Sequence, residues 1–457
     1  MPLRSVHITN YYHKNSGGIS TSYNNLLAAA ERHRRYIRLI VPGEDDAVED
    51  VNEFARIYYV PAKYSPVFDK RYRIMMPWQY MKGGSPIRRI LLEEKPDLIE
   101  VTDKYTLSLM GAMVRLNKFK KLGRPVMVHF SCERMDDNIG SFLIGGKTGD
   151  WIARRIMGNY NLPGFDYHIA NSAYTADEFH RSYRAADNPG RSEWFFNKCW
   201  RFFGAPRVPV SERIEVCPRG VDVWQFSPDR GSDEIGVEMR RKAGISADAV
   251  MMLYAGRISP EKNIGLLVDM MRQLAADPDN DYRLLVAGAG PQAEWLQQQG
   301  DKYCPGRIIQ LGHLEKSVLC GYYAKADIFV HPNPREPFGI APLEAMASGV
   351  PTVAPNAGGI LSYATNDNAW LVEPTGEAFA AAVREVVADP ALRAAKTELA
   401  LRTALSNTRE ASTDNLIATY DRIFEDFQSR RELFLDGPEA KLFNYVELTK
   451  DGNAAND

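Results

Sequence analysis

Two glutamates, Glu336 and Glu344, stand eight residues apart within Arg335–Gly359, which has the sequence REPFGIAPLEAMASGVPTVAPNAGG. Pro337 breaks regular structure and Gly339 allows a close backbone approach. We therefore expect Glu336 on a loop and Glu344 about one turn into the helix that follows it. A carboxylate on this loop can accept hydrogen bonds from sugar hydroxyls, and a carboxylate in the helix can bind a ribose diol. The N–H groups of the first helical turn would face an anion. The pattern predicts a nucleotide-sugar site, with a capped helix and solvated glutamates as the alternative.

The elements expected around this pair form a helix and a strand. The helix would begin at Ile340 and end before Gly349, a residue type suited to the position just past a helix end. Its buried face would carry Leu343, Met346 and Ala347. Val350–Ala354 has the composition of a short buried strand. We expect further strands at 5–9, 36–41, 98–102, 125–130, 167–171, 250–255, 283–287, 307–311 and 328–331, with helical stretches between them. This alternation predicts parallel sheets covered by helices.

The composition bounds the class of protein. A chain of 457 residues with 45% apolar and 25% charged residues is typical of a soluble globular protein of about two or three domains. The net charge of −2 gives no overall attraction to nucleic acid, so we expect no nucleic-acid partner. The five cysteines lack metal-ligand or redox spacing, which indicates a reduced interior. Without a signal-peptide core or a membrane-spanning run, we expect a cytoplasmic protein that can sit at the inner face of the plasma membrane.

The run from Glu336 to Ala354, E-P-F-G-I-x-P-L-E-A-M-A-x-G-x-P-T-V-A, closely resembles the E-x7-E signature of retaining glycosyltransferases of family four. Supporting matches spread the resemblance over most of residues 5–430. It implies an α/β chain with the GT-B fold, which has two Rossmann-like doubly wound domains facing a central cleft. The implied parts are an N-terminal acceptor-binding domain at 1–218, a C-terminal nucleotide-sugar-binding domain at 219–410, a helix at 411–435 that crosses back to the first domain, and a loose tail at 436–457.

By this resemblance, Glu344 would hold the ribose hydroxyls and Glu336 the hydroxyls on the far side of the donor sugar. Backbone N–H groups of Phe338, Gly339 and Ile340 would help to hold the sugar or the diphosphate.

The segment Gly256–Asn263 resembles the phosphate-binding loop of the same family, with Arg257 and Lys262 as its cations. A departing diphosphate gains negative charge, which fixed cations stabilise most in the transition state. Each charge-assisted hydrogen bond would contribute about 1.5–3 kcal/mol. Surface charges beside a turn are the alternative for these two residues.

Four further donor-binding residues are implied by the resemblance. Gly17 and Gly18 match a glycine pair that lets a phosphate approach the first domain, Gly290 follows the strand at 283–287, and His313 lies where the family lines its base pocket. A tight structural turn and a loop-capping histidine are the corresponding alternatives.

His129 matches a family histidine beside the reacting sugar, where an imidazole can bond a hydroxyl or, when protonated, favour developing phosphate charge. The alternative is a hydrogen-bonded histidine inside a core strand.

The segment 181–210 departs from the regular alternation. It holds the basic residues Arg181, Arg184, Arg191, Lys198, Arg201 and Arg207 and the aromatic residues Trp194, Phe195, Phe196, Trp200, Phe202 and Phe203. Such a basic aromatic insert can contact a membrane surface or a lipid-linked acceptor. The alternative is a helical hairpin that packs its aromatic side chains on the first domain.

Together these features predict a retaining hexosyltransferase that moves a sugar from a UDP- or GDP-sugar to a glycan or lipid-linked acceptor in bacterial polysaccharide or glycolipid biosynthesis. In this family the attack occurs on the same face and the departing diphosphate takes the acceptor proton, so a missing catalytic base is no objection. We expect no cofactor and no metal, because the acidic pairs Asp45–Asp46 and Asp136–Asp137 do not resemble a D-x-D metal motif. A sugar-nucleotide epimerase and a non-catalytic nucleotide-sugar sensor remain as alternatives.

Overall fold

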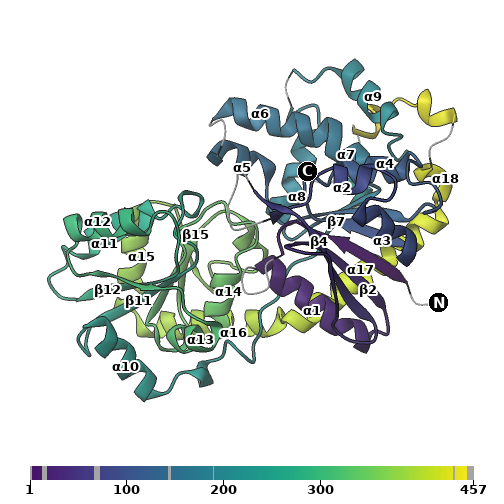
Figure 1. Ribbon diagram of the computed structural model, residues 1–457. Helices are drawn as coiled ribbons and strands as arrows, with labels where there is room; N and C mark the ends of the chain where they lie inside the picture. Colours follow the sequence, from purple (N-terminus) through teal and green to yellow (C-terminus); the bar gives the residue numbers. More distant parts are fainter. Residues whose placement is uncertain are drawn as a thin grey trace. The chain divides into compact units, whose positions relative to one another are not determined.

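A computed structural model describes residues 3–12, 18–65, 73–142, 146–188, 190–435 and 438–449 of the chain (Figure 1). The chain forms two compact units. Unit 1 comprises Met1–Pro218 and Thr413–Asp457, and unit 2 comprises Arg219–Ser412. Each unit contains a sheet of mainly parallel strands with helices around it, which confirms the predicted α/β class.

The sheet of unit 1 has the order β10-β9-β8-β7-β1-β2-β4-β3, and only its edge strand β3 runs antiparallel to its neighbour. Its strands are β1 (Arg4–Ile8), β2 (Tyr36–Gly43), β3 (Ala47–Asp50), β4 (Ala55–Pro61), β7 (Leu98–Val101), β8 (Val126–Ser131), β9 (Tyr167–Ala170) and β10 (Ile214–Val216). A short antiparallel ribbon joins β5 (Lys63–Tyr64) to β6 (Arg73–Ile74). The central strands β7, β8 and β9 are buried at every residue, as expected for parallel strands covered on both faces.

The helices of unit 1 include the long C-terminal helix. They are α1 (Gly18–Arg32), α2 (Trp78–Met81), α3 (Pro86–Glu94), α4 (Leu109–Arg115), α5 (Met135–Phe142), α6 (Lys147–Ile156), α7 (Leu162–Gly164), α8 (Ala173–Tyr183), α9 (Glu193–Phe202), α17 (Arg409–Ser429, which begins in unit 2) and α18 (Arg431–Phe434). A π-helical turn at Met157–Asn161 joins α6 to α7. Ile417 and Tyr420 of α17 are buried in the same cluster as Leu39 of β2. The Tyr420 hydroxyl also donates to the buried Glu100 carboxylate, so α17 is fixed to this sheet by packing and by a hydrogen bond.

The sheet of unit 2 is entirely parallel, with the order β13-β12-β11-β14-β15-β16. Its strands are β11 (Val250–Ala255), β12 (Tyr282–Ala287), β13 (Ile308–Gly312), β14 (Ile328–Val330), β15 (Thr352–Pro355) and β16 (Trp370–Val372). Its helices are α10 (Asp233–Ala243), α11 (Gly265–Leu274), α12 (Ala293–Tyr303), α13 (Lys316–Lys325), α14 (Ile340–Ala347), α15 (Gly376–Ala388) and α16 (Pro390–Ser406). Leu253 packs into one hydrophobic cluster and its neighbour Met252 into another, so the alternating residues of β11 serve two cores.

Counted along the chain, the strands of unit 2 lie in the order 3-2-1-4-5-6, which is the order of a Rossmann sheet. The first strand, β11, lies beside the fourth, β14, and successive strands are added outward on both sides of this pair. This reversal creates a switch point, and ligands of such sheets bind outside the carboxyl ends of the strands that flank it.

The aromatic residues of the 181–210 insert divide into two sets. Phe196 and Trp200 on α9 are fully buried, and the Trp200 indole donates to the Gly158 carbonyl at 2.9 Å. Trp194 and Phe202 are instead about 70% exposed, at 69% and 70%. Packing therefore explains one face of α9 and leaves its other face exposed.

The prediction of a loose tail at 436–457 is wrong for residues 439–449. Tyr445 is fully buried, its ring packs against that of Trp200 with centroids 5.6 Å apart, and its hydroxyl donates to the Ala205 carbonyl at 2.8 Å. Arg201 of α9 donates to the Phe443 carbonyl at 2.9 Å. The overall polarity of the segment concealed the few apolar side chains that dock it on α9.

No helix in the part of the chain that the structure describes is long and apolar enough to cross a membrane.

We predict that Trp200→Ala lowers the free energy of unfolding by about 3–5 kcal/mol, because it empties a fully buried site and removes the Trp200–Gly158 hydrogen bond. Trp194→Ala is the matched control on the same helix, and its effect should stay within about 0.5 kcal/mol because the side chain is exposed. Urea denaturation followed by circular dichroism measures both. Equal destabilisation by the two substitutions would contradict the division of α9 into a buried and an exposed face.

Candidate functional site

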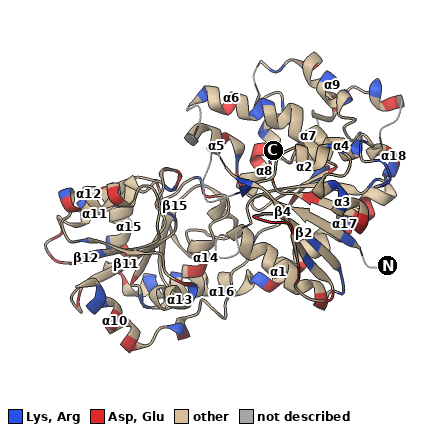
Figure 2. Cartoon of the chain, viewed as in Figure 1, with Lys and Arg blue, Asp and Glu red and all other residues tan. Residues whose placement is uncertain are grey.

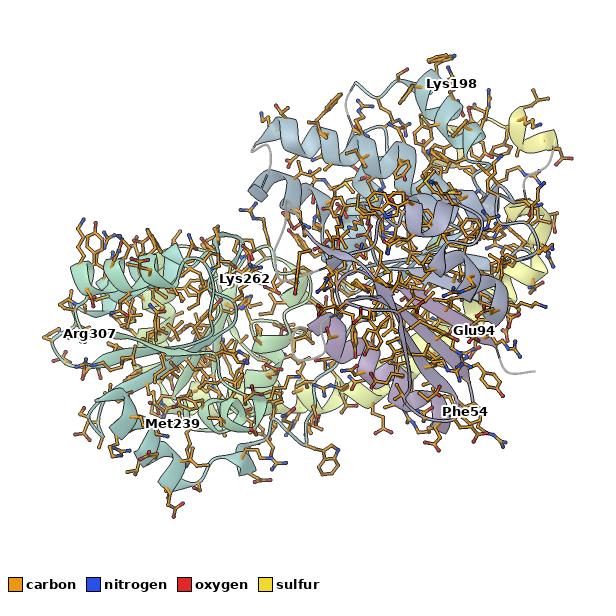
Figure 3. All side chains as sticks on the ribbon, viewed as in Figure 1. Phe54, Glu94, Lys198, Met239, Lys262 and Arg307 are labelled. Atoms are coloured by element: carbon orange, nitrogen blue, oxygen red, sulfur yellow. The ribbon has the colours of Figure 1, made fainter. Side chains whose placement is uncertain are left out.

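Two loops of unit 2 meet at its switch point. The loop after β11 carries Lys262 (Figure 3). The loop after β14 carries Glu336. The Lys262 ammonium donates to Glu336 Oε2 at 2.8 Å. The structure thus brings together two residues that lie 74 positions apart in the sequence and that the sequence had assigned to separate motifs.

The loops are also joined through their backbones and amide side chains. Asn263 has a left-handed conformation, with φ +55°, and its side chain donates to the Pro332 carbonyl at 3.0 Å. Asn333 donates to the same oxygen of Glu336 that Lys262 binds, at 2.8 Å. Glu336 Oε2 therefore accepts hydrogen bonds from an ammonium and from an amide, and these two bonds fix its position.

The electrostatics of this pair keep Glu336 ionised. Burial by itself raises the pKa of the Glu336 carboxyl, but the Lys262 ammonium, with contributions from His331 and Asn333, outweighs burial and lowers that pKa to about 2. A carboxylate with this pKa accepts hydrogen bonds at every physiological pH. It suits a ligand that presents hydroxyl groups.

Glycines allow the backbone around the loops to pack closely. A Cβ at Gly290 would lie 2.1 Å from the Ile258 carbonyl oxygen, and a Cβ at Gly359 would lie 2.0 Å from that of Pro337. The Gly359 N–H in turn donates to the Glu336 carbonyl at 2.7 Å. Gly290 thus has a packing role against the Arg257 loop, and its assignment to donor binding stays a prediction.

The loop that carries Glu336 leads into α14, as expected. Gly339 precedes the helix with φ +89°, and no side chain caps the first turn. Phe338 is buried and packs against Tyr363, with ring centroids 5.2 Å apart, so its side chain belongs to the core. What this loop and the first turn at Ile340 can offer a ligand is their backbone N–H groups and the positive end of the helix dipole.

Glu344 lies one turn into α14, where the sequence placed it, and accepts a hydrogen bond from the Tyr323 hydroxyl at 3.1 Å. Burial raises the pKa of the Glu344 carboxyl to about 7, although Lys316, Tyr323 and Arg409 oppose the shift. The two glutamates of the motif therefore differ in acidity, because the pKa of Glu336 is about 2 and that of Glu344 is about 7.

Arg257 and His313 lie at the surface of the same unit. Arg257 Nη1 is 3.6 Å from Glu261 Oε1, and the His313 side chain is 65% exposed with its Nε2 atom 3.7 Å from Glu315 Oε1. Their roles toward a diphosphate and a base stay predictions.

Two of the residues predicted in unit 1 form the glycine pair. Gly18 is the first residue of α1 and is exposed, while Gly17 lies outside the described residues.

The prediction that His129 lies beside the reacting sugar is wrong. Its side chain is fully buried, and its ring lies 5.3 Å from that of Phe165 and 5.7 Å from that of Phe179. Burial, and after it the neighbouring His168, lowers the pKa of His129 well below its usual range, so the ring is neutral. The structure supports the alternative of a core histidine, because the strand continues through Ser131 and keeps position 129 inside the sheet.

Sequence reasoning missed several residues around the glutamates. Asn333 and Tyr323 bind the two carboxylates, Lys316 contributes charge near Glu344, and His331 lies 3.8 Å from Glu336. His331 and Asn333 could have been found from their place directly after a buried strand beside the switch point. Tyr323 and Lys316 come from α13, which carries no local motif.

Two family models match the chain, one in each unit. The model of the glycosyl transferases group 1 family matches residues 237–402, and that of the glycosyl transferase 4-like domain matches residues 17–189. The chain belongs to glycosyltransferase family four and has the GT-B fold, and it is a nucleotide-sugar glycosyltransferase.

Relatives agree with this family, and a solved structure agrees with the fold. A GDP-mannose-dependent alpha-(1-6)-phosphatidylinositol dimannoside mannosyltransferase of Mycobacterium tuberculosis is 26% identical over 393 residues, which cover 85% of this chain and 88% of the relative. A D-inositol 3-phosphate glycosyltransferase of Geodermatophilus obscurus is 34% identical over 239 residues, 49% of this chain and 51% of that protein. The crystal structure of Anabaena HepE in complex with UDP and glucose superposes with a TM-score of 0.62 at 17% identity, covering 92% of this chain and 99% of HepE.

If Glu344 binds the ribose diol, donor binding should release a proton at pH values below about 7. The diol donates to an ionised carboxylate, whereas a group with a pKa of about 7 carries a proton in the empty site at lower pH. We expect the affinity for the nucleotide-sugar donor to fall by up to ~10-fold for each pH unit below the pKa of Glu344. Calorimetry at pH 6.5 in two buffers of different ionisation enthalpy measures the released proton.

Glu344→Gln is the control for this measurement, because glutamine has the shape of glutamate and does not titrate in this range. The variant should lose the pH dependence. Proton release that is unchanged in Glu344→Gln, or absent from the wild type, would contradict the assignment.

Proposed function

We propose that the protein is a retaining hexosyltransferase that uses a GDP- or UDP-sugar, with GDP-mannose as the first candidate donor. The observation that carries the proposal is the Lys262–Glu336 contact at the switch point of unit 2, directly before the helix that holds Glu344. The choice of GDP-mannose comes from the mycobacterial relative, whose name specifies that donor.

In this proposal, Glu336 accepts hydrogen bonds from hydroxyls of the transferred sugar and Glu344 from the ribose. Lys262 and Arg257 stabilise the diphosphate as its negative charge grows. Lys262 is already held at the site by Glu336, so little reorganisation is needed when the diphosphate arrives.

The transfer exchanges one bond for another on the same face of the sugar. The bond between the anomeric carbon and the diphosphate oxygen breaks, and a bond from that carbon to an acceptor hydroxyl oxygen forms. The acceptor proton moves to the departing diphosphate. No protein carboxylate acts as nucleophile or base, so the protein contributes positioning and charge stabilisation.

We propose that the reaction needs no metal, since Arg257 and Lys262 supply the positive charge. Among the described residues, no group of three or more His, Cys, Asp or Glu side chains is placed to hold an ion.

We propose a glycan or lipid-linked acceptor, with peripheral membrane contact through α9. Trp194 and Phe202 expose large aromatic surfaces on this helix, and the Lys198 ammonium lies 4.8 Å from the centre of the Trp194 ring. Basic residues occur on α6 as well as α9 (Figure 2). Aromatic side chains flanked by cations suit the headgroup region of an anionic bilayer.

The transferase assignment predicts that Lys262→Ala and Glu336→Ala each reduce kcat for sugar transfer from GDP-mannose by about 10²–10³-fold, because each removes a polar group that binds the reacting part of the donor. Lys302→Ala, on the exposed surface of α12, is the matched control and should be unaffected. The assay measures release of nucleotide from GDP-, UDP- and ADP-sugars. It is run with and without lipid and glycan extracts, and with a chelator.

Tight donor binding without any turnover would contradict the transferase and favour the sensor. A changed sugar on an intact nucleotide would favour the epimerase.

If α9 contacts the membrane, the wild type should sediment with vesicles that contain phosphatidylglycerol. The double variant Trp194→Ser/Phe202→Ser should bind these vesicles at least ~10-fold more weakly, because burying each aromatic side chain contributes about 1.5–3 kcal/mol. Trp224→Ser is the matched control, because it removes a tryptophan of unit 2 that is 82% exposed. This variant should bind the vesicles as tightly as the wild type does. Equal binding by the double variant would contradict the contact.

A further inference from the structure

His331 is a buried histidine whose hydrogen-bonding capacity is unused. It directly follows β14 at the switch point and is 5% exposed. Neither ring nitrogen has a hydrogen-bond partner among the described residues. A buried polar group without a partner is costly, and such groups in native structures call for a specific reason.

The position of His331 is fixed by its backbone. Its N–H donates to the Val353 carbonyl of β15 at 2.9 Å, and the next residue, Pro332, accepts a hydrogen bond from Asn263 at 3.0 Å. The backbone that carries the ring is therefore held by β15 and by the loop that carries Lys262.

The ring faces one side of Glu336. His331 Nε2 lies 3.8 Å from Glu336 Oε2, which is too long for a hydrogen bond. Glu336 Oε2 already accepts hydrogen bonds from Lys262 and Asn333, so the other carboxylate oxygen, Oε1, is the one left to accept from a ligand. Glu336 and the ring of His331 therefore form a receptor for a hydroxyl group that donates to Oε1.

Charge determines which group fits this receptor. Glu336 is ionised, and burial lowers the pKa of His331 to about 4 despite the nearby Glu336, so the imidazole is neutral. A neutral imidazole offers one donor and one acceptor nitrogen. A phosphate oxygen would be repelled by the Glu336 carboxylate, whereas a sugar hydroxyl can donate to it and share a second hydrogen bond with the ring.

We propose that His331 contacts a hydroxyl of the transferred hexose, the same hydroxyl or the neighbour of the one bound by Glu336, and so helps to select the sugar. The proposal rests on the proposed function and adds a residue to the sugar half of the donor site. His331 contributes nothing to binding of the nucleoside diphosphate half.

The test compares binding of GDP and of GDP-mannose by calorimetry in the wild type and in His331→Phe, which keeps the ring volume and removes both nitrogens. We expect the affinity of His331→Phe for GDP-mannose to fall at least 10-fold and its affinity for GDP to stay within twofold. His331→Gln, which can place an amide near the former Nε2 position, should restore part of the affinity for GDP-mannose. Thermal unfolding of each variant verifies that it folds, and His331→Gln keeps the test valid if the phenylalanine is not tolerated.

Equal loss of GDP and GDP-mannose affinity, or no loss of either, overturns the role of His331 and leaves the proposed function intact. Failure of the wild type to bind any of GDP-mannose, UDP-glucose and ADP-glucose overturns the proposed function and this inference with it.

Discussion

The ion pair between Lys262 and Glu336 is the interaction on which the site depends. Its two partners follow neighbouring strands, β11 and β14, and the 2.8 Å contact requires the two loops to approach closely. Gly290 lets the loop after β12 pack on the Lys262 loop, and Gly359 lets the segment after β15 pack on the Glu336 loop, since a side chain at either position would collide with a carbonyl of that loop. Without the pair, a partly buried carboxylate would lose its main source of stabilisation.

The surroundings give each polar group of the site a different protonation state. Lys262 keeps the Glu336 carboxylate ionised, whereas Glu344, one turn into α14, is buried near weaker partners and has a pKa of about 7. His331 is neutral. A fixed carboxylate with a neutral imidazole suits sugar hydroxyls, and a lysine beside a helix N-terminus suits a diphosphate. The arrangement fits a donor that carries both sugar hydroxyls and a diphosphate. A site for a simple phosphate would need neither the carboxylate nor the imidazole.

The sequence predicted the α/β class, the loop position of Glu336 and the helical position of Glu344, because these follow from local signals such as Pro337, Gly339 and hydrophobic spacing. It could not predict the Lys262–Glu336 contact, which arises from strand order. It also misplaced His129, since a histidine near a strand end has the same sequence signature whether it faces a ligand or the core. The tail around Tyr445 was missed because its docking depends on contacts with Trp200 and Ala205, which are far away in the sequence.

We propose that a sugar diphosphate binds at the carboxyl ends of β11 and β14, between Lys262, Glu336 and the start of α14. A crystal structure with GDP-mannose bound tests it most directly. We expect a diphosphate oxygen within hydrogen-bond distance of Lys262 Nζ and a sugar hydroxyl within that distance of Glu336. A nucleotide sugar bound elsewhere, with the Lys262–Glu336 pair untouched by the ligand, would contradict it.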